Sequence, residues 1–175
     1  LILWNNRYFE RLDEPFRVRP DIAVAPGAYE FSEYRVSFST NPARRLSASV
    51  AYSPQTFYDG DRTDMSASLS VRVNSSLSAE GQISRNEVDL PAGSFEANIG
   101  SLRIDYAISP KMTLRSLTQY NSLTEQWSTA ARFHYMYRPG SDFYIVYDEV
   151  LRDPSRLPEF RDRHLILKMT YLLSR

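Results

Sequence analysis

Residues 65–73 read Met-Ser-Ala-Ser-Leu-Ser-Val-Arg-Val, and this stretch decides the fold. Apolar side chains occupy every odd position, from Met65 through Leu69 to Val73, whereas serines and Arg72 occupy the even positions. A two-residue period places alternate side chains on opposite faces of a β-strand. One face of this strand is therefore apolar and the other polar, as expected for a strand that separates lipid from a polar lumen.

The same alternation recurs along most of the chain. It predicts ten strands, over residues 1–12, 29–40, 45–53, 63–73, 77–88, 95–108, 112–121, 126–137, 142–150 and 161–173. The expected fold is all-β: an antiparallel up-and-down transmembrane β-barrel of about ten strands, complete in itself or the C-terminal part of a larger barrel. Residues 1–175 would form a single barrel domain or barrel segment.

Composition excludes several other classes. The 21 basic and 21 acidic residues balance, so there is no basic stripe for nucleic acid. The chain has no cysteine, which excludes a disulfide scaffold and a thiolate metal site. No apolar run reaches the roughly 18 residues of a membrane-spanning helix, but a spanning strand needs only about 9–11 residues, half of them polar.

The connections between the predicted strands differ in length. Residues 41–44, 74–76, 109–111 and 138–141 form short turns rich in Pro, Gly, Asn and Ser. Longer or more polar connections fall between them, over residues 13–27, 57–62, 89–94, 122–125 and 152–160. Short periplasmic turns that alternate with longer external loops are typical of outer-membrane barrels.

Order-specific motifs are spread over nearly the whole chain. They include Phe-Glu-Arg-Leu-Asp-Glu-Pro-Phe at 9–16, Tyr-Arg-Pro-Gly-Ser-Asp at 137–142 and Leu-Lys-Met-Thr-Tyr-Leu-Leu at 167–173. In these motifs the chain resembles the C-terminal barrel region of an uncharacterised bacterial envelope family that carries an N-terminal family-nine-like carbohydrate-binding domain. The resemblance implies an outer-membrane location, a chain that begins at Leu1 because the N-terminal remainder is absent, and glycan binding by that missing domain. It supplies no established activity.

Charged residues lie in the polar phase of several strands. As lumen-facing candidates we take Glu33, Arg35, Arg72, Glu80, Arg103, Asp105, Arg115, Arg132 and Lys168. Such residues either pair across strands and fill a small barrel, since buried charges must be paired, or line a selectivity constriction. For about ten strands in a closed barrel we favour the first interpretation.

Aromatic residues gather near the predicted strand ends, mostly in the apolar phase. They are Tyr52, Tyr106, Tyr120, Trp127, Tyr135, Tyr137, Tyr147 and Tyr171. This placement is typical of the aromatic girdles at the two membrane interfaces. Cross-strand aromatic pairing in a soluble sheet is the alternative.

Metal and catalytic chemistry have weak signals. Asp59, Asp61 and Asp64 offer three carboxylates to a hard cation such as Ca²⁺, but the twelve-residue calcium-loop spacing is missing, which favours an ordinary acidic turn. His134 and His164 lie on different predicted strands, with no acidic residue at ligand spacing. No phosphate loop or nucleophile elbow occurs, so we expect neither cofactor nor catalysis.

Two functions remain open. The first is an outer-membrane β-barrel of a Gram-negative envelope, porin-like, with outer-membrane lipid around it, which serves as an anchor, a pore or a docking component for other envelope proteins. The second is a soluble β-barrel or sandwich that binds a small ligand or glycan. The two are inside-out versions of one pattern, because the soluble protein would bury the apolar phase. An enzyme with its catalytic residues in loops ranks third.

Overall fold

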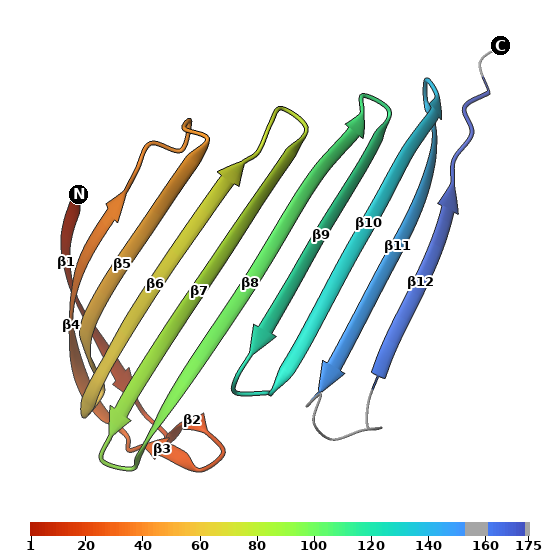
Figure 1. Ribbon diagram of the computed structural model, residues 1–175. Coiled ribbons are helices and arrows are strands. Elements are labelled where there is room, and N and C mark those ends of the chain that lie inside the picture. Colours follow the sequence, from red (N-terminus) through yellow and green to blue (C-terminus); the bar gives the residue numbers. More distant parts are fainter. Residues whose placement is uncertain (153–160, 174–175) are drawn as a thin grey trace. The chain divides into compact units, whose positions relative to one another are not determined.

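A computed structural model describes residues 1–152 and 161–173. Ten of its strands form one antiparallel sheet, in the order β1-β4-β5-β6-β7-β8-β9-β10-β11-β12, and β2 and β3 form a separate two-stranded sheet (Figure 1). The predicted all-β class and antiparallel up-and-down order are therefore confirmed. No helix in the described part of the chain is long and apolar enough to cross a membrane.

The ten predicted strands are all present, and several are longer than expected. The bounds are β1 (Ile2–Leu12), β2 (Phe16–Arg19), β3 (Ile22–Val24), β4 (Gly27–Ser39), β5 (Leu46–Phe57), β6 (Gly60–Arg72), β7 (Leu77–Leu90), β8 (Gly93–Ser109), β9 (Met112–Asn121), β10 (Gln126–Arg138), β11 (Ser141–Arg152) and β12 (Arg161–Met169).

The connections do not alternate in length, so that prediction was wrong. The expected long connections at 57–62 and 89–94 are two-residue turns, because β5 ends at Phe57, β6 begins at Gly60, β7 ends at Leu90 and β8 begins at Gly93. These segments were predicted to be loops because their side chains are polar. Hydrogen bonds between the backbones of neighbouring strands do not depend on side-chain polarity, so the strands extend into these segments. The predicted connection at 152–160 lies outside the described residues, apart from Arg152.

Even without the alternation, the meander has two distinct ends. Four connections, β1 to β4, β5 to β6, β7 to β8 and β9 to β10, define what we call the loop side. The connections β4 to β5, β6 to β7, β8 to β9 and β10 to β11 define the turn side. Successive antiparallel strands place these two sets at opposite strand ends.

The chain divides into two compact units. Unit 1 comprises Leu1–Thr40, Ser49–Ala67 and Ser84–Asn98, and unit 2 comprises Asn41–Ala48, Ser68–Ile83 and Ile99–Arg175. In unit 1 a ladder joins β1 to β4, from Ile2 opposite Ser37 to Leu12 opposite Gly27. In unit 2 antiparallel ladders join β8 to β9, β9 to β10, β10 to β11 and β11 to β12, with register shifts between Ala107 and Ser109 on β8 and between Met136 and Arg138 on β10.

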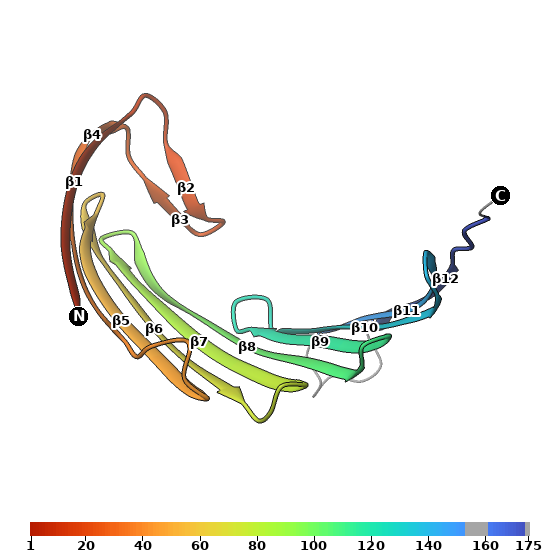
Figure 2. The same cartoon turned by 90° about the horizontal axis from the view of Figure 1, so that it is seen from above.

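The buried core of unit 1 is made by the β2–β3 hairpin, which the sequence interpretation treated as an unstructured connection. Ile22 and Val24 of β3 are 3% and 2% exposed and pack with Val88 and Leu90 of β7. Val88 and Leu90 continue the even, polar phase of β7, so the hairpin covers the polar face of that strand. Figure 2 shows the hairpin turned back from the ends of β1 and β4.

Candidate functional site

The strands carry two chemically different faces. We call the face with Ser66, Ser70 and Arg72 on β6, and its equivalents on other strands, the polar face, and the opposite one the apolar face. Registers extend these faces from strand to strand, since residues directly opposite in a ladder share a face. In unit 1, Asn6 and Trp4 stand opposite Glu33 and Arg35.

Large side chains of the apolar face are exposed rather than packed. The exposed fractions of Met65 and Leu69 on β6, and of Val73 directly after it, are 39%, 50% and 55%. The same holds for Tyr34, Val36 and Phe38 on β4, for Leu102, Ile104, Tyr106 and Ile108 on β8, and for Leu165, Leu167 and Met169 on β12. Exposed apolar surface of this extent marks a surface that meets lipid or a partner.

Charged residues replace apolar ones on this face toward the loop side. In unit 1, Arg85 pairs with Glu87 and lies 2.7 Å from Glu96, on the face opposite to Val88 and Phe95. In unit 2, Arg163 Nε lies 2.6 Å from Glu149 Oε1, and the two residues are register partners on β12 and β11. The apolar band of these strands therefore stops before the strands themselves do.

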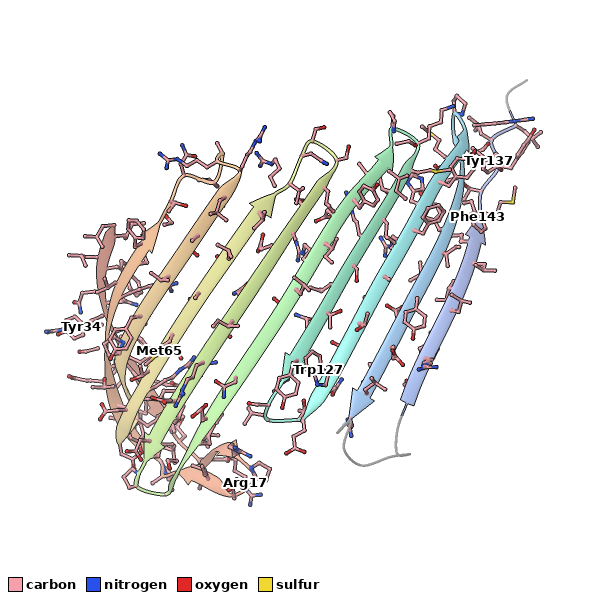
Figure 3. The ribbon with its side chains drawn as sticks, in the orientation of Figure 1. Arg17, Tyr34, Met65, Trp127, Tyr137 and Phe143 are labelled. Atoms are coloured by element: carbon pink, nitrogen blue, oxygen red, sulfur yellow. The ribbon has the colours of Figure 1, made fainter. Side chains whose placement is uncertain are left out.

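Aromatic residues stand at both ends of the apolar face of unit 2. Tyr120 and Trp127 are register partners beside the β9–β10 connection, with ring centroids 4.9 Å apart. At the turn side, Tyr137 donates a hydrogen bond to the Thr170 carbonyl oxygen at 2.8 Å. Figure 3 shows Trp127 and Tyr137 toward opposite ends of the β10 region.

The polar face of unit 2 brings several predicted residues together. Asp105 on β8 stands opposite Arg115 on β9, which stands opposite Arg132 on β10. Arg115 Nε lies 3.2 Å from Asp105 Oδ1, so this ion pair joins two adjacent strands. Beyond Arg132 comes Val146 of β11, which offers no charge.

A shallow depression of about 290 Å³ lies over this row in unit 2. Three arginines line it, Arg103, Arg115 and Arg132, together with the two carboxylates of Asp105 and Asp148. Among the residues that the structure describes, no ion pair within 4.0 Å involves Arg103, Arg132 or Asp148.

Other predicted polar-face residues stand apart from this row. Lys168 on β12 is opposite Tyr144, and Glu33 and Arg35 belong to unit 1. A second depression, lined by Arg72, Asp105 and Arg115, reaches the β6–β7 turn. Arg72 Nη1 donates to the Ala43 carbonyl oxygen at 3.4 Å. Glu80 takes part in no ion pair of the described residues.

The three aspartates proposed as a weak calcium site are not gathered. Asp64 lies 2.8 Å from Arg62 Nε and accepts a hydrogen bond from Gln55 Nε2 at 3.1 Å. Asp61, an odd residue of β6, lies on the opposite face of the strand. Within residues 1–152 and 161–173, no group of three or more His, Cys, Asp or Glu side chains could hold a metal ion.

Both histidines have acidic partners that the sequence interpretation missed. His134 Nε2 lies 2.7 Å from Asp142 Oδ1, across the β10–β11 hairpin, and its ring stacks on Tyr144. His164 Nε2 lies 3.0 Å from Asp162 on its own strand. Counting eight residues back from Asp142 across a two-residue turn would have found the first pair, because it is a diagonal neighbour in the hairpin.

The loop side of unit 1 holds an aromatic cluster on the polar face. Tyr8 and Phe31 are register partners whose rings stack 4.6 Å apart, and Phe31 is 2% exposed. Tyr58 packs against Phe31 and donates a hydrogen bond to Glu10 at 3.3 Å. Burial, followed by the nearby Glu10 carboxylate, raises the pKa of Tyr58.

The chain was compared with family models, with curated proteins and with solved structures, and only solved structures gave a match. No family model matches the chain, and no curated protein matches it. A solved structure of the NanC porin in a rhombohedral crystal form is similar over 98% of this chain and 93% of that chain, with 11% sequence identity and a TM-score of 0.43.

Proposed function

We propose that this chain forms the wall of an outer-membrane β-barrel in a Gram-negative envelope, with its apolar face in lipid and its polar face in water. The observation that carries the proposal is the exposed apolar band, bounded toward the loop side by charged pairs such as Arg163–Glu149. In a bilayer this band would be covered by acyl chains, and the charged pairs would lie among headgroups.

The height of the band fits a membrane. Along β6 and the residue that follows it, the band extends from Met65 to Val73, which is nine residues. At about 3.3 Å per residue this gives roughly 30 Å along the strand, and a strand tilt of about 40° reduces it to roughly 23 Å across the membrane. Outer-membrane barrels have apolar bands of about 25 Å.

The backbone is also suited to lipid. Cross-strand ladders pair the backbone groups of neighbouring strands, and lipid supplies no substitute partners. The aromatic residues at both ends of β10 would lie at the two interfaces, where a ring in apolar surroundings can keep its hydroxyl wet.

The alternative of a soluble barrel or sandwich requires the apolar phase to be buried. In the described residues the buried apolar side chains, which include Phe31 and Ala97, lie instead on the polar face or on the hairpin that covers it. This arrangement favours the membrane protein. The polar face then supports a water-filled passage in preference to a purely mechanical anchor, because it carries charges such as Arg103 and Asp148 that make no ion pair within residues 1–152 and 161–173.

The test is cell fractionation of the full-length protein, followed by gel mobility with and without boiling. The proposal expects outer-membrane location and a folded band that shifts on heating. Reconstitution in planar bilayers should then give discrete conductance steps. A protein that stays soluble without detergent and migrates identically with and without boiling would overturn the proposal.

A further inference from the structure

The arrangement of Arg115 and Arg132 calls for an explanation. These residues stand directly opposite one another in adjacent strands and on the same face. Like charges in directly opposite positions destabilise a sheet, whereas opposite charges in such positions stabilise it. Here Asp105 lies on one side and pairs with Arg115, but the neighbour on the other side of Arg132 is Val146.

The charge balance around Arg132 is therefore incomplete. Arg103 lines the same depression and makes no ion pair with any residue that the structure describes, whereas Asp148 stands diagonally across from Arg132 without approaching it within 4.0 Å. Three guanidinium groups face two carboxylates, of which one is already committed to Arg115. An anion placed between the arginines would balance the charge.

The chemistry of the depression defines the ligand. A guanidinium group presents paired donors that fit the two oxygens of a carboxylate or a phosphate, and two such groups side by side bind an oxyanion more strongly than one. Leu117, Ala130 and Val146 form apolar parts of the same lining, which suits a carbon skeleton attached to the anionic group.

We propose that Arg132, with Arg103 and Arg115, forms an oxyanion-binding site on the polar face, for a small solute that carries a carboxylate or a phosphate group. As a binding station for passing solutes the site rests on the proposed function, but binding itself can be measured in whichever solvent keeps the protein folded. Asp148 stands at the edge of the site and would select against a second negative charge on that side.

The experiment is calorimetric titration of the folded full-length protein at constant ionic strength, with sodium benzoate in one arm and inorganic phosphate in the other. Wild-type protein should show saturable binding in at least one arm, and the arm identifies the anionic group. Arg132→Gln should weaken binding roughly tenfold or more, because it removes a charged hydrogen-bonding partner. Arg132→Lys should restore part of the affinity, because it keeps the charge without the planar fork.

Arg44→Gln is the matched control. It removes the same charge from the β4–β5 turn, away from the depression, and should leave the affinity unchanged. Absence of saturable binding in both arms, or equal affinity in wild type and Arg132→Gln, would overturn the inference. Heat-dependent gel mobility of each variant separates this outcome from failure of the proposed function, since a folded membrane barrel that does not bind refutes the site alone.

Discussion

Gly60 and Asp89 make the tightest backbone approach found at any glycine in the described residues. A Cβ on Gly60 would lie 2.0 Å from the Asp89 carbonyl oxygen and 3.0 Å from the Leu90 Cα. Leu90 belongs to the buried core of unit 1, so the end of β7 cannot move away without disturbing the packing of Ile22. Glycine is required here because its neighbour is backbone, which cannot rotate aside as a side chain would.

Gly60→Ala should lower the free energy of unfolding by about 1–3 kcal/mol, as overpacking of a fixed contact does. The measurement is the urea midpoint of the folded protein. Gly81→Ala is the control, since nothing lies within 4 Å of its Cβ position, and it should be close to neutral. Equal midpoints for the two variants would show that the backbone near Gly60 and Asp89 shifts to make room for the methyl group at little cost in stability.

Tyr58 offers a pH-dependent signal outside the spanning strands. Its pKa is raised first by burial and then by the nearby Glu10 carboxylate. The folded state favours the neutral phenol, so this stabilisation is complete below the unfolded value of about 10 and is lost as the pH rises through the higher folded value. The difference in phenolate absorbance between wild type and Tyr58→Phe isolates this group.

That difference titration should have its midpoint above pH 10, and Glu10→Gln should lower the midpoint, because it removes the negative charge while keeping an acceptor oxygen. Stability measured between pH 9 and 12 should fall more steeply in wild type than in Tyr58→Phe. A midpoint that Glu10→Gln leaves in place would mean that the charge of Glu10 contributes nothing to the shift.

At the scale of elements, the β2–β3 hairpin is held by few residues. Ile22 is nearly fully buried and also lies 3.3 Å from the Cβ position of Gly93. Ile22→Ala should therefore cost about 2–4 kcal/mol locally. We expect hydrogen exchange in residues 16–24 to accelerate while β9–β11 stay protected, because those strands belong to unit 2. Ala23→Ser, an exposed change on the same strand, should have little effect.

Periodicity predicted the strands well because most of them alternate apolar and polar side chains over several consecutive residues. The hairpin escaped prediction because its strands are only four and three residues long and are bounded by Pro15, Pro20 and Pro26. Its burial depends on Val88 and Leu90, more than sixty residues away, and no local pattern records that contact.

The candidate site could likewise be predicted only in part. The sequence placed Asp105 and Arg115 in the polar phase of their strands, and the Asp105–Arg115 pair could be anticipated from a two-residue turn at 110–111. The Arg115–Arg132 juxtaposition depends on the register of the β9–β10 ladder, which a four-residue connection leaves undetermined in sequence.

At the scale of the whole molecule, the two faces of a strand should respond oppositely to charge. Leu69→Arg places a charge in the proposed acyl region and should cost roughly 2–4 kcal/mol of stability in a bilayer. Ser70→Arg, one residue away on the polar face, should be tolerated. Urea unfolding in lipid vesicles measures both variants. Similar losses would contradict the assignment of faces, and a loss confined to Ser70→Arg would reverse it.

The packing of the β2–β3 hairpin on β7 also implies an order of folding steps. Nearly every strand of the sheet pairs with its neighbour in the chain, so the ladders can form one after another with short loops to close. Docking of Ile22 and Val24 is different, because its platform on β7 is synthesised and paired only later. The hairpin therefore docks after β7 is in place, and the burial of Ile22 is a kinetic marker for the completion of unit 1.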